Sequence, residues 1–339
     1  MEQERRSIRV GLAVIACAIV FRLISAGVLE QTLALLRHPA VASFQVYMET
    51  GRIVGIPPEP TDSPVPETTD PPPTPPPPQQ EEKPRFQAQD AQLVDISRLC
   101  GYAVDVEQLL LSPLTWDLTQ GGPAVLILHT HATESYTQVS GDTYAESSAY
   151  RTLDTQHNMV RIGDEIAELL ESHGIEVLHD TTLHDYPSYS GSYSAARNTI
   201  ADYLKQYPSI RMVLDIHRDA AELDGEVQLT TNATVGGHAS SQLMMVVGTD
   251  AGGLYHPGWQ ENMALALKLH VQLEKNDPGI CRPVSFRTER FNQDMLPGAL
   301  LIEIGAAGDT LQQALTAAQA LAQGIIDLAA GTATADSTN

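Results

Sequence analysis

A block rich in proline most tightly limits what this chain folds into. Residues 57–84 consist largely of proline, threonine, glutamate and aspartate, with unbroken proline runs at 71–73 and 75–78. Proline lacks a backbone N–H, so this block cannot form regular helix or sheet hydrogen bonds. Its apolar side chains are also too few to bury enough surface for a core. We therefore expect residues 38–94 to form an extended polyproline II linker, with a folded domain at 95–332 and a disordered tail at 333–339.

Basic residues and a long apolar stretch precede the linker. Arg5, Arg6 and Arg9 are followed by an uncharged run at 10–21, then by Arg22 and a second apolar run at 23–29. The total length suits a membrane span, and an arginine near one end of a span can extend its charge to the interface. We predict a cytoplasmic basic end and a single-pass anchor at 1–37, which places the later residues outside the cell membrane. The alternative is a cleaved signal peptide with Ala26 as the cleavage residue.

Charge and cysteine content exclude several classes of protein. The chain has 20 basic and 42 acidic residues, a formal charge of -22, whereas phosphate binding relies on clustered Lys and Arg. We therefore expect no nucleic-acid partner. Three cysteines, Cys17, Cys100 and Cys281, are too few for a disulfide framework or a thiolate zinc site. A Cys100–Cys281 bridge and two unpaired thiols both remain open.

After the linker, short apolar runs alternate with segments of helical periodicity. Strands are predicted at 125–128, 175–178, 211–216, 226–231, 243–247 and 299–304, and helices at 158–173, 195–207, 259–273 and 311–329. Gly174 is expected to end the first of these helices in the left-handed conformation. A strand, helix, strand order produces parallel pairs with right-handed crossovers. The predicted fold class is α/β, a three-layer domain with a mostly parallel sheet and helices on both faces.

Polar residues interrupt or follow three of the predicted strands. His129, His131 and Glu134 follow the first, His217 and Arg218 follow the third, and Glu303 lies inside the last. The carboxyl ends of strands in an open α/β sheet face the crevice where ligands bind. Zinc hydrolases use three ligands drawn from His, Asp and Glu, together with a separate carboxylate that moves a proton. The apolar neighbours of Glu303 make it costly to bury unpaired, although a structural salt bridge is an alternative.

Three motifs together resemble one known family. They are His-Thr-His-Ala-Thr-Glu-Ser-Tyr at 129–136, Asp-Ile-His-Arg-Asp-Ala at 215–220, and Asn-Gln-Asp at 292–294 leading to Leu-Ile-Glu-Ile-Gly at 301–305. In sequence and order they resemble the stage II sporulation protein P family over roughly residues 124–329, and the predicted anchor and linker match its layout. The resemblance implies an N-acetylmuramoyl-L-alanine amidase-like catalytic domain that hydrolyses peptidoglycan with zinc during spore engulfment. Members are also credited with endopeptidase action on stem-peptide crosslinks.

The resemblance also implies roles for individual residues. Zn2+ would be held by Glu134, His217 and one of His129 and His131, which lie two residues apart. Glu303 would be the catalytic carboxylate. Arg218 or a tyrosine would stabilise the oxyanion, or Arg218 would pair with Asp215 or Asp219 and brace the site.

The resemblance also implies peptidoglycan as the substrate and the membrane at the sporulation septum as the location. The implied protein partners are stage II sporulation proteins D and M. A catalytically silent scaffold that binds peptidoglycan or a partner, and a metallopeptidase of other specificity, are the alternatives. One departure from the family pattern stands at Asp309-Thr310, where the family tends to have Asn-Thr, so a substrate contact by that Asn does not carry over. We expect Asp309 to be the N-cap of the last helix.

Overall fold

The computed structural model describes residues 85–114, 118–119, 121–220, 222–223 and 227–336. The described residues all belong to one compact unit. The segment predicted as a membrane anchor, and the linker as far as residue 84, lie outside the described residues. Within the described residues, no helix is both long and apolar enough to cross a bilayer.

The described residues contain strands, helices and two short 3-10 helices. The strands are β1 (Ile96–Arg98), β2 (Val125–Leu128), β3 (Val177–His179), β4 (Met212–Asp219), β5 (Glu222–Leu223), β6 (Val227–Gln228), β7 (Ala233–Val235), β8 (His238–Ser240), β9 (Leu243–Val247), β10 (Val284–Phe286) and β11 (Ala299–Ala306). The helices are α4 (Val106–Leu111), α5 (Met159–Ser172), α6 (Ser192–Gln206), α7 (Trp259–Asn276) and α8 (Leu311–Asp336), with 3-10 helices η1 (Ala88–Leu93) and η2 (Gln293–Met295).

A mixed, mostly parallel sheet forms the centre of the domain. In the described part of the chain it has seven strands in the order β1-β10-β9-β11-β4-β2-β3. Every neighbouring pair is parallel except β9 and β11, which run antiparallel. The predicted α/β class with a mostly parallel sheet is therefore confirmed. The ends of β11, β4 and β2 lie at one edge of the sheet, because these strands run in the same direction.

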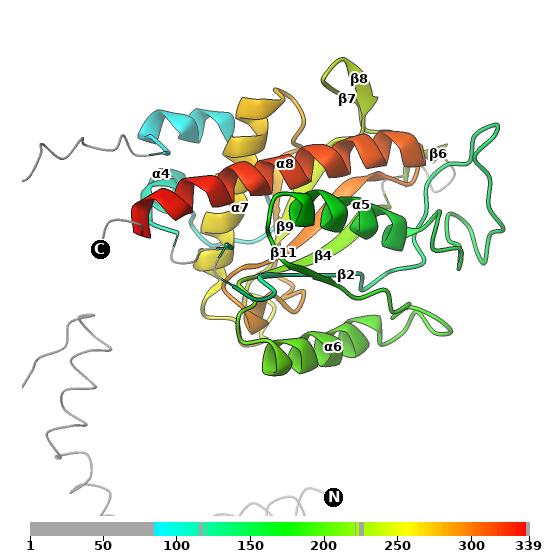
Figure 1. Ribbon diagram of the computed structural model, residues 1–339, viewed down its shortest axis with the longest axis horizontal. Helices are drawn as coiled ribbons and strands as arrows, with labels where there is room; N and C mark the ends of the chain where they lie inside the picture. Colours follow the sequence, from blue (N-terminus) through cyan, green and yellow to red (C-terminus); the bar gives the residue numbers. More distant parts are fainter. Residues whose placement is uncertain (1–84, 115–117, 120, 221, 224–226, 337–339) are drawn as a thin grey trace, which may run out of the picture. The chain divides into compact units, whose positions relative to one another are not determined.

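Helices cover both faces of the sheet, which gives three layers. Figure 1 shows α5, α7 and α8 above the sheet and α6 below it. Side chains of β2 alternate between the two faces: Val125 and Ile127 join the larger core, whereas Leu126 and Leu128 join the core under α6. Burial on both faces explains why this strand is a continuous apolar run rather than an alternating one.

Local signals in the sequence set the ends of the helices. Asn158 caps α5 by accepting a hydrogen bond from Val160 N, and Gly174 follows this helix at φ +80°, as predicted. At α8 the expected cap is wrong. Asp309 instead accepts bonds from Thr231 N, Thr231 Oγ1 and Ala306 N, while Thr310 and Gln313 bond reciprocally in a capping box.

Two further segments differ from the sequence-based expectation. The predicted strand at 226–231 is shorter, because β6 pairs only with β5 in a separate two-stranded hairpin and Thr231 N is taken by Asp309. Phe86 is buried and η1 packs against α4 and α7, so the packed part of the chain begins before residue 95. The predicted domain boundaries as a whole stay a prediction.

Candidate functional site

Three of the predicted site residues meet where β2 and β4 end. The rings of His131 and His217 lie edge to face with their centroids 5.3 Å apart. Glu134 Oε2 lies 3.7 Å from His217 Nδ1. All three side chains are buried. The meeting follows from the parallel pairing of β2 with β4, which brings the residues after Leu128 beside those after Asp215.

Glu303 lies beside this group. It is the register partner of His217 on the neighbouring parallel strand β11. Ile216, Ile302 and Ile304 point into the core under α5, α7 and α8, so the alternation along each strand turns His217 and Glu303 to the α6 face. The sheet thus presents both side chains to the same space.

The carboxyl of Glu303 has an unusual environment. Its Oε2 is buried without a hydrogen-bond partner, and Glu303 forms no ion pair with any residue that the structure describes. Burial raises the pKa of Glu303 to about 8, with Glu134 and Asp219 adding to the rise and His217 and Arg218 opposing it. A structural salt bridge therefore does not account for this carboxyl.

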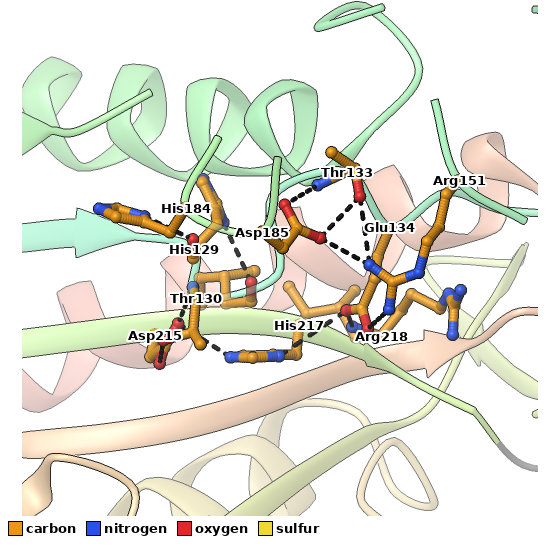
Figure 2. A network of polar contacts seen from close by, with 12 residues as sticks. His129, Thr130, Thr133, Glu134, Arg151, His184, Asp185, Asp215, His217 and Arg218 are labelled. Carbon is orange, nitrogen blue, oxygen red and sulfur yellow. Dashed lines mark hydrogen bonds and ion pairs between the residues drawn. The ribbon is translucent and has the colours of Figure 1, made fainter. Parts of the chain in front are cut away.

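His129 points elsewhere. Its Nδ1 lies 3.0 Å from Ile216 O, and its Nε2 lies 2.9 Å from His179 Nε2, whose Nδ1 in turn contacts Asp164 Oδ1 at 2.9 Å. Figure 2 shows His129 and Glu134 at opposite ends of the polar network. Burial above all lowers the pKa of His129 to about 3, so the ring is neutral. Because both ring nitrogens are engaged, His131 is the histidine of this motif that joins Glu134 and His217.

The close approach of His129 and His179 to α5 depends on a glycine, Gly163. A Cβ at Gly163 would lie 2.7 Å from His129 Nε2 and 2.3 Å from His179 Nε2, inside any real contact distance. Sequence reasoning identified neither His179 nor Gly163.

Asp215 holds His217 on the side away from Glu134. Its Oδ1 lies 2.9 Å from His217 Nε2, and Thr130 donates to Asp215 from its backbone N at 2.8 Å and from Oγ1 at 2.6 Å. The contact with Nε2 is electrostatic, since this nitrogen lacks a well-directed acceptor among the described residues. A strand places side chains i and i+2 on one face, so the Asp-Ile-His spacing was the available signal for this pair.

Charges in the group are strongly coupled. Burial lowers the pKa of His217, but Asp215, with Glu134 and Glu303, outweighs burial and raises that pKa to about 9. Burial raises the pKa of Asp215, but the charge of His217 and the hydrogen bonds from Thr130 outweigh burial and lower the pKa of this carboxyl to about 2. Three carboxyl groups therefore surround one imidazole, and that arrangement favours positive charge at its centre.

A second network fixes Glu134. Arg151 Nη2 lies 3.2 Å from Glu134 Oε1, while its Nη1 donates to Asp185 Oδ2 at 2.6 Å. Thr133 Oγ1 also donates to Asp185 Oδ2 at 2.6 Å, and the backbone N of Arg218 donates to Glu134 Oε2 at 3.3 Å (Figure 2). Arg151 and Asp185 lie in loops, where no periodic pattern marks them. Sequence reasoning missed both residues.

Arg218 braces the loop that carries Glu134. Its Nε donates to Ser135 O at 3.1 Å and its Nη2 donates to Tyr150 O at 2.9 Å. The predicted pairing with Asp215 or Asp219 is wrong, since Asp219 pairs with Arg282 at 2.8 Å and Asp215 contacts Thr130 and His217.

Two tyrosines pack against His131. Tyr189 stacks on its ring at 4.5 Å with an interplanar angle of 8°, and Tyr193 meets it edge to face at 5.5 Å. Burial raises the pKa of Tyr193 far above its ordinary value, so its hydroxyl keeps its proton. Tyr189 is 59% exposed and also lies under the Arg151 guanidinium. These rings make one wall of the site.

The donors of His131, Glu134 and His217 lie close together but not yet in one coordination sphere. Among the described residues, the group with three metal-binding side chains within 4.8 Å of one another is His270, Glu274 and Cys281. In a tetrahedral zinc site with Zn–N bonds of about 2.0 Å, two imidazole centroids lie roughly 5 Å apart. The observed 5.3 Å between the centroids of His131 and His217 is close to that spacing.

The chain matches a known protein family over most of its length. The family model described as Stage II sporulation protein P matches residues 65–326. This chain belongs to the stage II sporulation protein P family. The matched range contains the whole site, from His131 through Glu134 and His217 to Glu303.

Individual proteins resemble the chain to differing extents. Stage II sporulation protein P of Bacillus subtilis (strain 168) is 29% identical over 210 residues, which cover 58% of this chain and 49% of that protein. The chain therefore spans about half the length of that relative of the family. Among solved structures, the N-acetylmuramoyl-L-alanine amidase AmiC2 of Nostoc punctiforme is 17% identical and covers 61% of this chain and 97% of its own, with a TM-score of 0.36. The N-acetylmuramoyl-L-alanine amidase of Clostridium difficile 630 is 16% identical and covers 65% and 100%, also with a TM-score of 0.36.

Proposed function

We propose that this protein is a zinc-dependent peptidoglycan hydrolase that cleaves the amide between the lactyl group of muramic acid and L-alanine of the stem peptide. One observation carries the proposal: Glu303, a partly buried residue whose Oε2 is buried without a hydrogen-bond partner, lies on β11 beside His131, Glu134 and His217, which lie at or beyond the carboxyl-terminal halves of β2 and β4. Membership of the stage II sporulation protein P family supports the cell-wall substrate.

The residues present fit a zinc ion. His131, Glu134 and His217 supply the nitrogen and oxygen donors of a catalytic zinc site, in which three protein ligands leave one position open. The His131 Nδ1 is buried and, within the described chain, has no hydrogen-bond partner. Asp215 beside His217 Nε2 matches the carboxylate–histidine arrangement that orients ligand imidazoles. The raised pKa of His217 indicates that the group attracts positive charge.

A zinc ion held by these residues would supply Lewis-acid activation of water and of the scissile carbonyl. Glu303 then has the role of general base. Its carboxyl, kept from full ionisation by burial, loses its proton more readily once a cation lies nearby. In that state it takes a proton from the attacking water and returns it to the leaving amine of L-alanine.

Other side chains prepare the site rather than react. Arg151 holds Glu134 by its Oε1, which leaves Oε2 directed at His217. Arg218 acts as a positioning residue, since its guanidinium is occupied by two backbone carbonyls. Tyr193, protonated and edge-on to His131, is the better placed donor for the developing oxyanion.

The N-terminal sequence supports a location for this activity. The apolar stretch within 1–37 would anchor the chain in the membrane as a single pass, and a proline-rich linker extends about 3.1 Å per residue. We propose that the linker carries the domain to the extracytoplasmic cell wall at the sporulation septum during engulfment. Stage II sporulation proteins D and M are the proposed partners, and the acidic chain argues against nucleic acid.

Metal analysis of the purified protein, combined with a peptide-release assay, distinguishes the proposed enzyme from a catalytically silent scaffold. An enzyme requires metal at the His131 site and loses release of peptides from purified sacculi when a chelator removes it, with recovery on adding Zn2+. A scaffold would bind sacculi equally with and without the chelator and release nothing in either condition. Endopeptidase action on crosslinks would appear in the same assay as cleaved dimeric peptides.

A further inference from the structure

A second group of metal-binding side chains lies away from the proposed catalytic site. His270 and Glu274 are four residues apart on α7, and Cys281 is in the loop that joins α7 to β10. One donor atom from each residue lies within 4.8 Å of the other two. His270 is only 3% exposed, and the loop that follows is short.

The imidazole of His270 is already oriented as a ligand would be. Its Nε2 lies 3.1 Å from Leu93 O, and a carbonyl oxygen can only accept, so Nε2 carries the proton. Nδ1 is therefore the nitrogen with the free lone pair. It is buried and makes no hydrogen bond to any described residue. Metal-binding histidines are commonly fixed in this way, with the second ring nitrogen donating to a backbone carbonyl.

Glu274 is held rigidly beside it. Its Oε2 accepts from Gly279 N at 2.9 Å and its Oε1 accepts from Cys281 N at 2.8 Å. These two bonds fold the loop over the end of α7 and bring the sulfur of Cys281 to the carboxylate. Each carboxylate oxygen has two lone pairs, so both retain one for a cation.

Cys281 completes the set. It is unpaired among the described residues, as is Cys100, whose sulfur instead contacts Thr249 Oγ1 at 3.6 Å. The disulfide left open by the sequence is therefore absent. Burial above all, and next Glu274, raise the pKa of the Cys281 thiol well above its ordinary value. Without a cation the sulfur thus keeps its proton.

We propose that His270, Glu274 and Cys281 bind a second divalent metal ion, with zinc as the preferred ion, independently of the proposed catalytic site. Nitrogen, oxygen and sulfur donors together suit zinc better than the hard cations Mg2+ and Ca2+. Bonds of about 2.0–2.3 Å place tetrahedral donors roughly 3.5 Å apart, and the three donor atoms here already lie within 4.8 Å of one another. Binding forms a metal–sulfur bond and releases the thiol proton to solvent.

The position of the cluster points to a structural role. Arg282, next to Cys281, pairs with Asp219 at the end of β4, and Cys281 itself bridges to Leu243 at the start of β9. A metal here would fasten the end of α7 to the loop that leads into β10. It would do so without touching the residues proposed to carry out hydrolysis.

Cobalt substitution of the full-length chain tests the proposal, because only a thiolate ligand produces the sulfur-to-Co2+ charge-transfer band in the near ultraviolet. The proposed catalytic site has no cysteine, so the band reports the second site alone. We expect titration with Co2+ past two equivalents per chain to produce a band with the intensity of one thiolate-bound Co2+, and Cys281→Ser to lose it. Cys100→Ser, Cys17→Ser and His131→Ala should keep it.

Several outcomes overturn the proposal. A metal-stripped wild type that shows no band on titration with Co2+ does so directly, whatever the variants do. A band that survives Cys281→Ser does so as well. If Cys281→Ser fails to fold, His270→Gln replaces it, with the same expected loss of the band. Failure of the proposed hydrolase function would instead appear as absent peptide release with the band intact.

Discussion

Glu303 on β11 and His217 on β4 are register partners across two parallel strands, and both face α6. This pairing brings a carboxyl with a pKa raised to about 8 next to an imidazole with a pKa raised to about 9. The two shifts have different origins. Glu303 resists ionisation because its Oε2 is buried without a hydrogen-bond partner, whereas His217 is charged because Asp215 and other carboxyls surround it. A cation in this space would satisfy the carboxyls and leave His217 free to bind it as a neutral ligand.

Replacing Glu303 with Gln tests its role as the base. Because the amide cannot take a proton from water, we expect Glu303→Gln to lower the rate of peptide release by about 10²–10⁴-fold while zinc content stays unchanged. The measurement is peptide release from sacculi together with zinc per chain. Glu168→Gln, at an exposed position on α5, is the matched control and should retain full activity. A Glu303→Gln protein as active as the wild type would remove this residue from the mechanism.

Replacing each of the two histidines of the first motif should have a different effect on zinc content and stability. His131→Ala should remove zinc from the catalytic site, since this ring faces Glu134 and His217. His129→Ala should keep the zinc but lower the free energy of unfolding by about 1–3 kcal/mol, because Ile216 O and His179 lose a buried partner. Zinc analysis and thermal unfolding of both variants measure the difference. Zinc lost only on replacing His129 would reverse the assignment.

The sequence predicted the frame of this site better than its fine structure. Two apolar runs followed by His129 and His217, and a third that contains Glu303, indicated three strands of one sheet, because a parallel strand buried on both faces is a continuous apolar run. The choice between His129 and His131 had no such pattern. It depends on which side of one loop faces Ile216 and which faces His217, and that is a matter of tertiary packing.

The site residues in loops and the direction of the strands were the hardest features to predict from the sequence. Arg151 and Asp185 reach the site from segments without periodicity, so nothing in the order of residues marked them. The antiparallel pairing of β9 with β11 was also unmarked, since a buried strand looks the same in either direction. Short strands such as β1 and β10, each of three residues, fell below the length at which alternation can be recognised.

Stability of the metal-stripped protein should fall as pH rises from about 7 to 9, above the range in which the lowered pKa values of His129 and His131 act in the opposite direction. The folded protein binds protons more tightly than the unfolded chain at Glu303, whose pKa rises from 4.5 to about 8, and at His217, whose pKa rises from 6.5 to about 9. The stabilisation from such groups is complete below the unfolded pKa and is lost as pH passes the folded pKa. Thermal unfolding across this range measures the slope.

The Glu303→Gln variant provides the control for that slope. Without the carboxyl, the fall between about pH 7 and 8 should become shallower, and the part due to His217 should persist up to about pH 9. A melting temperature that rises between about pH 7 and 9 in the stripped wild type would contradict the protonation states assigned to Glu303 and His217.

Arg151 should tune metal affinity without touching the metal. Lysine keeps the charge but lacks the fork that reaches Glu134 and Asp185 together, so Arg151→Lys should weaken zinc affinity by about 10–100-fold. Competition with a chelator measures the affinity. Arg161→Lys is the matched control, because among the described residues Arg161 pairs only with Glu165, on the same helix, at 2.7 Å. Equal affinities in the two variants would show that Glu134 needs no support from Arg151.

Mass spectrometry of the material released from purified sacculi tests the central claim most directly. An amidase releases intact stem peptides that begin with a free L-alanine amino group and leaves glycan strands without peptides. We predict these two products from the zinc-loaded protein and neither from the Glu303→Gln variant. Peptides cut internally, with L-alanine still attached to muramic acid, would contradict the amidase assignment, and no released material at all would contradict the enzyme.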